Sequence, residues 1–196
     1  MSGLDNITWI KSNNIKPLKG RVLISEPLLL DLYFQRSVVL LLDNEKDGAV
    51  GIILNKEIAT PFNEIVKDFP QFDVKVYLGG PLAQDSLFFL HNLGNEIPDS
   101  EEILPGVFWG GDLNEVSNLI EMGVAKPSNF KFFLGYSSWE PEQLDNEIEQ
   151  NSWVINTISA KQVFNKQTDN LWKDSIRKLG GEYLYWLNFP VDPSNN

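Results

Sequence analysis

Apolar residues in this chain fall mainly into short runs of strand length, separated by glycine, proline and polar turns. The run Ser37–Asp43 is nearly continuous and begins with β-branched residues, as in a buried central strand. A polar turn separates it from the second apolar run, Ala49–Asn55, so the two runs predict an antiparallel hairpin. Further strands are expected at Arg21–Ser25, Val74–Leu78, Ser86–His91, Gly106–Trp109, Phe130–Tyr136 and Trp153–Asn156.

Other segments repeat their apolar residues at helical spacing. The segment Thr168–Leu179 carries an apolar stripe and is followed by Gly180–Gly181, which predicts a helix with a glycine C-cap. Asp112 with Glu115 predicts a capping box at the start of another helix. Shorter helices are expected at Pro61–Asp68 (with Thr60 as its cap), Pro141–Gln150 and Ser159–Phe164, a helical turn or loop at Leu28–Phe34, and a loop at Gly94–Pro105.

The order of these elements decides the expected fold class. Strands and helices are mixed, and several neighbouring strands are hairpin-linked, which favours an α+β fold over a purely parallel, doubly wound sheet. No internal repeat, low-complexity tract or long linker divides the chain, so residues 1–196 are expected to form a single domain.

Charge and residue usage exclude several classes of function. The chain has a formal net charge of −11, and the basic residues between Lys161 and Lys178 alternate with acids, which predicts a solvated helix face and argues against DNA binding. The absence of cysteine removes disulfides and thiolate chemistry. The N-terminal segment lacks a signal-peptide pattern, and the longest apolar run, Val38–Leu42, is too short to span a membrane. We therefore expect a cytoplasmic protein without a membrane partner.

Three glycine-centred turns follow strand-like runs and indicate a candidate site. They are VYLGGP at Val76–Pro81, VFWGGD at Val107–Asp112 and KFFLGYSSW at Lys131–Trp139. Glycine suits positions where the chain takes positive φ or where its backbone approaches another group, so these turns predict exposed amides along one edge. None has the spacing of a phosphate-binding loop, and Asp112 would cap its own helix.

Few side chains suit catalysis. His91 is the only histidine, and a serine triad would have to combine it with Ser137 or Ser138, which lack the nucleophile-elbow pattern. The acidic residues around Pro141–Gln150 are explained by the helix dipole better than by a metal site. Trp109 and Trp139 each adjoin a glycine turn, where an aromatic ring could flank a ligand.

The same residues, taken in order, resemble the AlgH/YqgE-like proteins of bacteria over about residues 20–194. The resemblance is carried by Gly48–Gly51 with Asn55, Gly79-Gly80-Pro81, Leu90-His91, Gly110-Gly111-Asp112, Gly135-Tyr136 with Trp139, Gln143-Leu144 with Glu147, Trp153, Leu179–Gly181 and Asp192–Ser194. The chain departs from the family pattern at Lys56-Glu57, commonly Arg-Pro, and in GYSSWEP, where a small residue and glycine usually precede the tryptophan. The resemblance implies an α+β domain with a strongly curved, partly barrel-like mixed or antiparallel sheet flanked by helices. It implies no catalytic residue and no cofactor. Members of the family are sometimes labelled transcriptional regulators.

We favour a non-enzymatic binding or regulatory module that binds a small molecule or a protein partner without contacting DNA directly. The predicted contact surface consists of Asn55, Gly79, Gly80, Pro81, His91, Trp109, Gly110, Gly111, Asp112, Gly135, Tyr136 and Trp139. No catalytic residue, metal or cofactor is assigned. One alternative is an enzyme with Asp112 and His91 as acid and base. A second is a regulator that binds DNA directly.

Overall fold

The predicted hairpin forms the middle of the sheet. A computed structural model describes residues 10–190. In it β2 (Val38–Glu45) and β3 (Gly48–Ile53) pair antiparallel, with a bulge between Leu41 and Asp43. Both strands are largely buried, as expected for a continuous apolar run that is covered on two faces.

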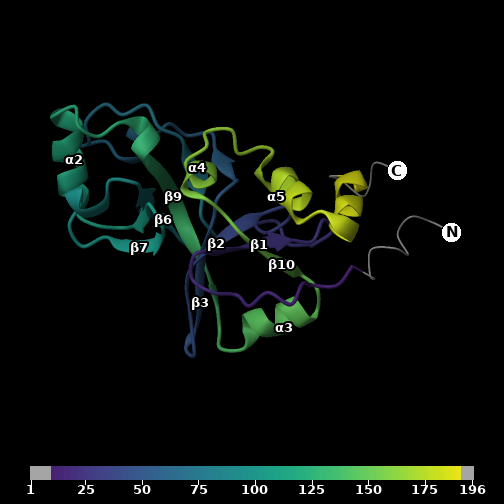
Figure 1. Ribbon diagram of the computed structural model, residues 1–196. Helices are drawn as coiled ribbons and strands as arrows, with labels where there is room; N and C mark the ends of the chain where they lie inside the picture. Colours follow the sequence, from purple (N-terminus) through teal and green to yellow (C-terminus); the bar gives the residue numbers. More distant parts are fainter. Residues whose placement is uncertain (1–9, 191–196) are drawn as a thin grey trace.

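The sheet has ten strands and is curled but not closed (Figure 1). Its main path runs β10 (Trp153–Thr157), β1 (Arg21–Ser25), β2, β3, β9 (Phe130–Trp139), β6 (Leu82–His91), β8 (Val107–Trp109) and β7 (Glu101–Leu104). Off this path, β5 (Val76–Leu78) pairs parallel with β9 and antiparallel with β4 (Glu57–Ile58). The predicted α+β class with a curved, mostly antiparallel sheet is confirmed.

Helices cover the sheet on different sides. Figure 1 shows α4 (Ala160–Val163) and α5 (Leu171–Leu179) above the sheet, α3 (Gln143–Glu149) below it and α2 (Leu113–Glu121) at one end. The remaining elements are α1 (Phe62–Ile65) and three 3₁₀ segments: η2 (Gly94–Glu96), η3 (Pro127–Asn129) and η4 (Gly181–Asn188). Gly180 follows α5 at φ 69°, which confirms the predicted glycine C-cap.

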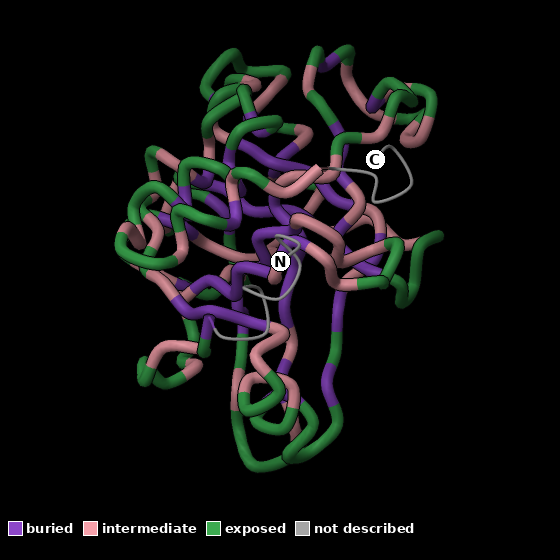
Figure 2. Tube along the Cα trace, turned by 90° about the vertical axis from the view of Figure 1, so that its right-hand side faces the viewer, coloured by how far each residue is buried: buried purple, intermediate pink, exposed green. Residues whose placement is uncertain are grey.

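The core is divided among three clusters of buried side chains. The largest packs α5 and η4 onto β1 and β2, and the second gathers phenylalanines around α1 and α2. The third lies between the sheet and α3. In Figure 2 the buried residues run through the middle of the chain trace, and the exposed ones lie in the peripheral loops. Strand β9 contributes to all three clusters, so it joins the parts of the domain.

Several predicted boundaries are wrong. The expected helix Pro61–Asp68 contains only Phe62–Ile65, because the Asn63 amide bonds to the carbonyls of Phe69 and Pro70 and fixes that segment as irregular chain. Its N-cap is Pro61 rather than Thr60. The expected loop Gly94–Pro105 contains η2 and β7, and α5 begins three residues later than expected. Strand β4 forms by pairing with β5, which is distant along the chain and is not encoded in a local pattern. Strand β7 forms a tight hairpin with β8 across Pro105-Gly106.

The predicted capping box before α2 is also wrong in detail. The Asp112 carboxylate accepts a hydrogen bond from Asn114 N at 2.9 Å, which caps the helix without help from Glu115. Glu115 instead accepts from the side chain of Asn118. The helix itself begins where the sequence places it, at Leu113.

Glu147 of α3 holds two buried tryptophans together. Its Oε2 accepts hydrogen bonds from Trp139 Nε1 at 2.9 Å and from Trp153 Nε1 at 2.7 Å.

Replacing Glu147 with alanine is expected to lower the free energy of unfolding by about 2 kcal/mol, because two indole N–H groups lose their acceptor inside the protein. Chemical denaturation measures this loss. The exposed Glu149 on the same helix serves as the control, and Glu149→Ala is expected to change stability by less than about 0.5 kcal/mol. Equal losses for the two variants would contradict the assignment.

Candidate functional site

The first and third glycine turns pack directly against each other. Gly79, Gly80 and Gly135 are buried. A Cβ atom on Gly79 would lie 2.1 Å from the Gly135 carbonyl oxygen, and one on Gly80 would lie 2.2 Å from the Tyr136 backbone. The Gly79 amide donates to Leu134 O at 2.8 Å, so it is used inside the sheet. The expectation of exposed amides is therefore wrong at Gly79, because the parallel pairing of β5 with β9 brings the end of β5 against Gly135, which lies within β9 rather than in a turn.

The second glycine turn lies between β8 and α2, and β8 is separated from β9 by the single strand β6. Gly110 has φ 68° and donates its N–H to Phe89 O at 3.0 Å, while Gly111 has φ 111° and lies against Ile97. Both positions require glycine for their backbone angles. Since the other two segments fill each other's space, no opening lies between them, and a contact surface that includes the second turn stays a prediction.

Three other predicted site residues serve the fold. Asn55 Oδ1 accepts from Val38 N at 2.8 Å, and its Nδ2 donates to Arg36 O at 2.9 Å. Trp139 is buried under α3 and bonded to Glu147. His91 is buried and stacks on Phe108 at 5.5 Å.

The acid–base alternative finds little support in the geometry of His91 and Asp112. Burial lowers the pKa of His91 to about 4, with the Gly110 backbone opposing the shift, so the ring is neutral near pH 7. Its Nδ1 accepts from Leu93 N at 3.3 Å. The Asp112 carboxylate is occupied as a helix cap. Neither residue lines the pocket described below.

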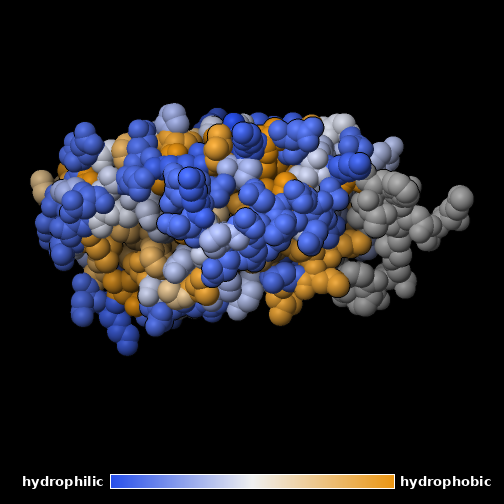
Figure 3. All heavy atoms as spheres, turned by 90° about the horizontal axis from the view of Figure 1, so that it is seen from below, coloured by the Kyte–Doolittle hydropathy of each residue, from blue (hydrophilic) through white to orange (hydrophobic). Residues whose placement is uncertain are grey.

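Trp109 and Tyr136 lie in a row of half-buried aromatic rings. Phe88 is the centre of the row: it stacks on Trp109 at 5.6 Å and meets Tyr136 edge-on at 5.6 Å. Pro81 is exposed nearby in sequence, at the start of β6. Figure 3 shows hydrophobic surface in two areas of the underside, one toward the α2 end and one near the chain termini. A ligand or partner role for these residues remains a prediction.

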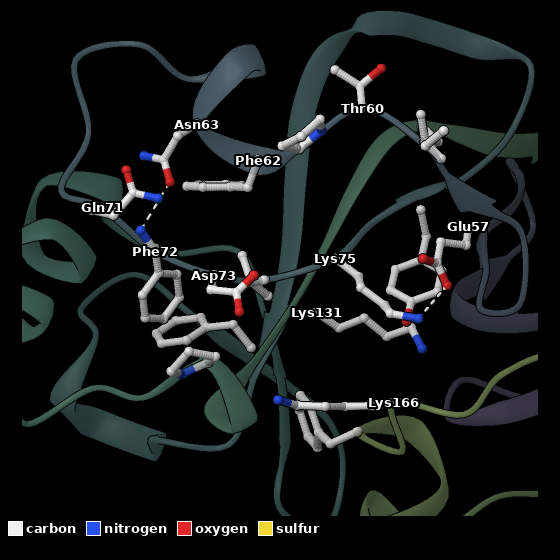
Figure 4. Close-up of a pocket in the computed structure, with 18 of the residues that line it drawn as sticks. Glu57, Thr60, Phe62, Asn63, Gln71, Phe72, Asp73, Lys75, Lys131 and Lys166 are labelled. Atoms are coloured by element: carbon white, nitrogen blue, oxygen red, sulfur yellow. Dashed lines mark hydrogen bonds and ion pairs between the residues drawn. The ribbon is translucent and has the colours of Figure 1, made fainter.

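A pocket of about 340 Å³ lies elsewhere, beside the first residues of the parallel strands β5 and β9. Its wall is formed by the chain from β4 to α1, the segment leading into β5, η3 with the start of β9, and the end of α4. Figure 4 shows Asn63, Gln71 and Phe72 on one side, Glu57, Lys75 and Lys131 on the other, and Lys166 below them.

Aromatic rings and lysines line this pocket together. The rings are those of Phe62, Phe72, Tyr77, Phe130 and Phe164, and the cations are Lys75, Lys131 and Lys166. Lys75 is paired with Glu57 at 2.6 Å near the surface, and Lys166 is exposed. Asn63 holds the Phe72 backbone, since its Oδ1 accepts from Phe72 N at 2.9 Å. The walls are thus positioned by bonds within the fold.

Lys131 is the unusual residue of the pocket. Its side chain is almost fully enclosed, with 3% of the residue exposed, and its Nζ lies 4.0 Å from the centre of the Tyr77 ring. Within residues 10–190 no hydrogen bond or ion pair engages this amine. Burial lowers the pKa of Lys131 to about 7, with Glu57 raising it and Lys75 lowering it further.

Sequence reasoning missed this pocket, although one signal was available. Lys131 is the only charged residue in β9, in the sequence FKFFLGYSSW. A lysine among phenylalanines in a strand either extends its amine to the surface or is buried, and burial of a lysine is rare and costs stability. The pocket also needs Glu57, Phe72 and Lys166, which only the tertiary structure brings near β9.

Two other features are absent from residues 10–190. This part of the chain has no cluster of three histidine, cysteine, aspartate or glutamate side chains arranged to hold a metal ion. It also has no helix whose length and apolar character would allow it to cross a membrane.

Comparison with known proteins gives consistent matches over nearly the whole chain. A family model described as AlgH-like matches residues 22–184. A UPF0301 protein of Parabacteroides distasonis is 40% identical over 198 residues, covering 100% of both chains, and one of Bacteroides thetaiotaomicron is 41% identical with 97% of each covered.

Two solved structures share the fold. The crystal structure of protein DIP2367 from Corynebacterium diphtheriae superposes with a TM-score of 0.75 at 20% identity, covering 93% of this chain and 97% of the other. The solution structure of the AlgH protein from Pseudomonas aeruginosa gives a TM-score of 0.71 at 24% identity, covering 92% and 98%. At these identities the likeness concerns the fold alone.

Proposed function

Because this chain belongs to the AlgH-like family, and the names of its relatives state no activity, we propose that it is a binding module without catalytic activity. The ligand is a small organic molecule, and its site is the pocket that contains Lys131. This keeps the class of function predicted from the sequence and moves the site away from the glycine turns.

The observation that carries the proposal is a buried lysine inside an aromatic-lined cavity, whose amine makes no ion pair or hydrogen bond within residues 10–190. Burying an amine in this way costs stability, since its charged form loses hydration that the Tyr77 ring and the nearby charge of Glu57 replace only in part. Strongly perturbed groups in clefts are enriched at functional sites. If Lys131 only filled space in the fold, methionine or leucine would serve equally well, because they occupy a similar volume without the cost of burying a charge.

The lining defines the general chemistry of the ligand. A cavity of about 340 Å³ is within the size range of small-molecule sites. The phenylalanine rings suit an aromatic or aliphatic body, while Lys131, Lys75 and Lys166 suit a polar, oxygen-bearing group. The ligand is therefore amphipathic and small.

A regulatory role is compatible with this site. The net charge of −11 opposes contact with DNA phosphates, so regulation would act through the bound molecule or a protein partner. The half-buried row of Phe88, Trp109 and Tyr136 is the surface we propose for such a partner.

Thermal-shift screening against a metabolite and nucleotide library tests the proposed function. A ligand present at about a hundred times its Kd is expected to raise Tm by about 5–10 °C. Ala59 is exposed at the pocket, so Ala59→Trp is designed to block it without entering the core, and it is expected to abolish the shift.

Lys46→Trp is the matched control for this screen. It adds the same ring at an exposed site between β2 and β3, and it is expected to leave the shift unchanged. A ligand whose shift survives Ala59→Trp binds elsewhere and contradicts the proposal. A library without any stabilising compound counts against a small-molecule function.

A further inference from the structure

We propose that Lys131 binds a carbonyl group of its ligand covalently, as a reversible imine. The inference rests on the proposed function, because a small molecule must first enter the pocket. The ligand class is accordingly an aldehyde or ketone on a small aromatic or aliphatic body. Lys131 becomes the point of attachment, and the phenylalanine rings hold the remainder.

The three lysines of the pocket differ in the way that this chemistry requires. Lys75 is exposed and paired with Glu57 at 2.6 Å, so its ammonium form is stabilised. Lys166 is exposed to water. Lys131 alone has its amine enclosed beside a ring face, with no carboxylate bonded to it among the described residues. Enclosure favours the neutral amine, and only the neutral amine has the lone pair needed for attack.

Burial also changes the amount of reactive amine. The pKa of Lys131 is lowered to about 7, so a large share of the amine is neutral at pH 7. An ordinary lysine with a pKa of about 10.4 has on the order of a thousandfold less neutral amine at that pH. A less basic amine is also a weaker nucleophile. The reactivity advantage of Lys131 is therefore smaller than the difference in the amount of neutral amine.

The reaction balances without an oxidant or reductant. The Nζ lone pair attacks the carbonyl carbon, a C–N bond forms, and the carbonyl π electrons move to oxygen, which takes up one of the two protons of the attacking nitrogen. The carbinolamine then loses one proton from nitrogen and its hydroxyl group as water, leaving a C=N bond. Amine and carbonyl thus give imine and one water, and hydrolysis reverses the step.

Reductive trapping tests the inference on the full chain. The probe is benzaldehyde with cyanoborohydride at pH 7, whose hydride reduces an imine to a stable secondary amine. Peptide mapping by mass spectrometry then locates the adduct. Labelling at Lys131 is expected to exceed labelling at Lys75 and Lys166 by about tenfold or more, from the difference in neutral amine. The preference is expected to shrink toward pH 10, where the other lysines also lose their protons.

Matched variants separate the site from general reactivity. Lys131→Met is expected to remove the preferred adduct and leave only the slow labelling of exposed amines, including the N-terminal amine. Lys173→Met, which removes an exposed lysine of α5 outside the pocket, is expected to leave labelling at Lys131 unchanged. Ala59→Trp is expected to reduce it by about tenfold or more, as the route through the pocket closes. Circular dichroism of each variant confirms that it is folded.

The outcomes distinguish the two proposals. Labelling at Lys131 no greater than at Lys166 overturns the imine. If a ligand then still raises Tm and loses its effect in Ala59→Trp, the proposed function stands and the ligand is held by non-covalent contacts, such as a carboxylate on the ammonium group. Labelling at Lys131 that is unaffected by Ala59→Trp overturns the pocket as the route of entry.

Discussion

Replacing Lys131 with methionine is expected to stabilise the protein by about 3–5 kcal/mol at pH 6 and to give only a small gain at pH 10. The expected size follows from the pKa of Lys131, which burial lowers from 10.5 to about 7 in the folded state. One pKa unit corresponds to about 1.4 kcal/mol of differential stability. Methionine has a similar length, and it fills the same space without a charge.

The direction of the pH dependence follows from proton binding. Between pH 7 and 10.5 the unfolded chain holds a proton on Lys131 that the folded protein has released. The stability of the natural chain therefore rises with pH through this window, and the penalty is fully present below pH 7. Lys131→Met lacks this dependence, so the difference between the two proteins narrows as pH increases. Urea denaturation at pH 6, 8 and 10 measures it.

Lys166→Met is the control, because it removes another lysine of the same pocket from an exposed position. It is expected to change stability by less than about 0.5 kcal/mol at each pH. If Lys131→Met gave the same gain at pH 6 and pH 10, the amine would not be buried in its neutral form. The imine inference would lose its physical basis with that result.

Replacing Gly79 with alanine is expected to lower the free energy of unfolding by about 4 kcal/mol or more, at the upper end of single substitutions. The new Cβ would lie 2.1 Å from the Gly135 carbonyl oxygen and 2.8 Å from the Ile52 side chain. The nearest atom belongs to the backbone of a central strand, so it cannot move aside without breaking the pairing of β5 with β9. Chemical denaturation, or the soluble yield if the variant fails to fold, reports the loss.

Gly110→Ala provides the matched control for this steric effect. No atom lies within 4 Å of a Cβ at Gly110, so only its φ of +68° opposes the substitution. A loss of about 1 kcal/mol is expected from that backbone strain. Similar losses at both positions would show that Gly79 is needed for local conformation, and that the close approach of the two turns has little energetic weight.

The glycine turns show how far sequence patterns reach. The sequence marks Gly79, Gly80 and Gly135 as positions that need glycine, and the structure agrees. The reason differs: the glycines let two backbones touch, whereas the sequence predicted amides open to a ligand. Glycine signals close approach, but a linear pattern does not state what approaches.

The fold class was predictable because its signals are local. The apolar runs of β2 and β3 are separated by a short polar turn, and the stripe on α5 repeats at helical spacing, so each element is encoded within its own segment. Chain order then favoured hairpins and an α+β sheet. The short strand β4 was missed, since it exists only through pairing with β5, twenty residues further along the chain. Strand β7 was missed although its hairpin with β8 is local, because two of its four residues are glutamates.

By itself, the sequence determined the class of fold, the main strands and helices, the family and the exclusion of thiol chemistry. Only the tertiary structure decided where a ligand would bind. Lys131 appears in the sequence as one lysine among phenylalanines, and its burial depends on Tyr77, Phe72 and the end of α4, which lie far from it along the chain. The pKa of an amine depends on the dielectric and charges around it, and these are properties of the packed chain rather than of its neighbours in sequence.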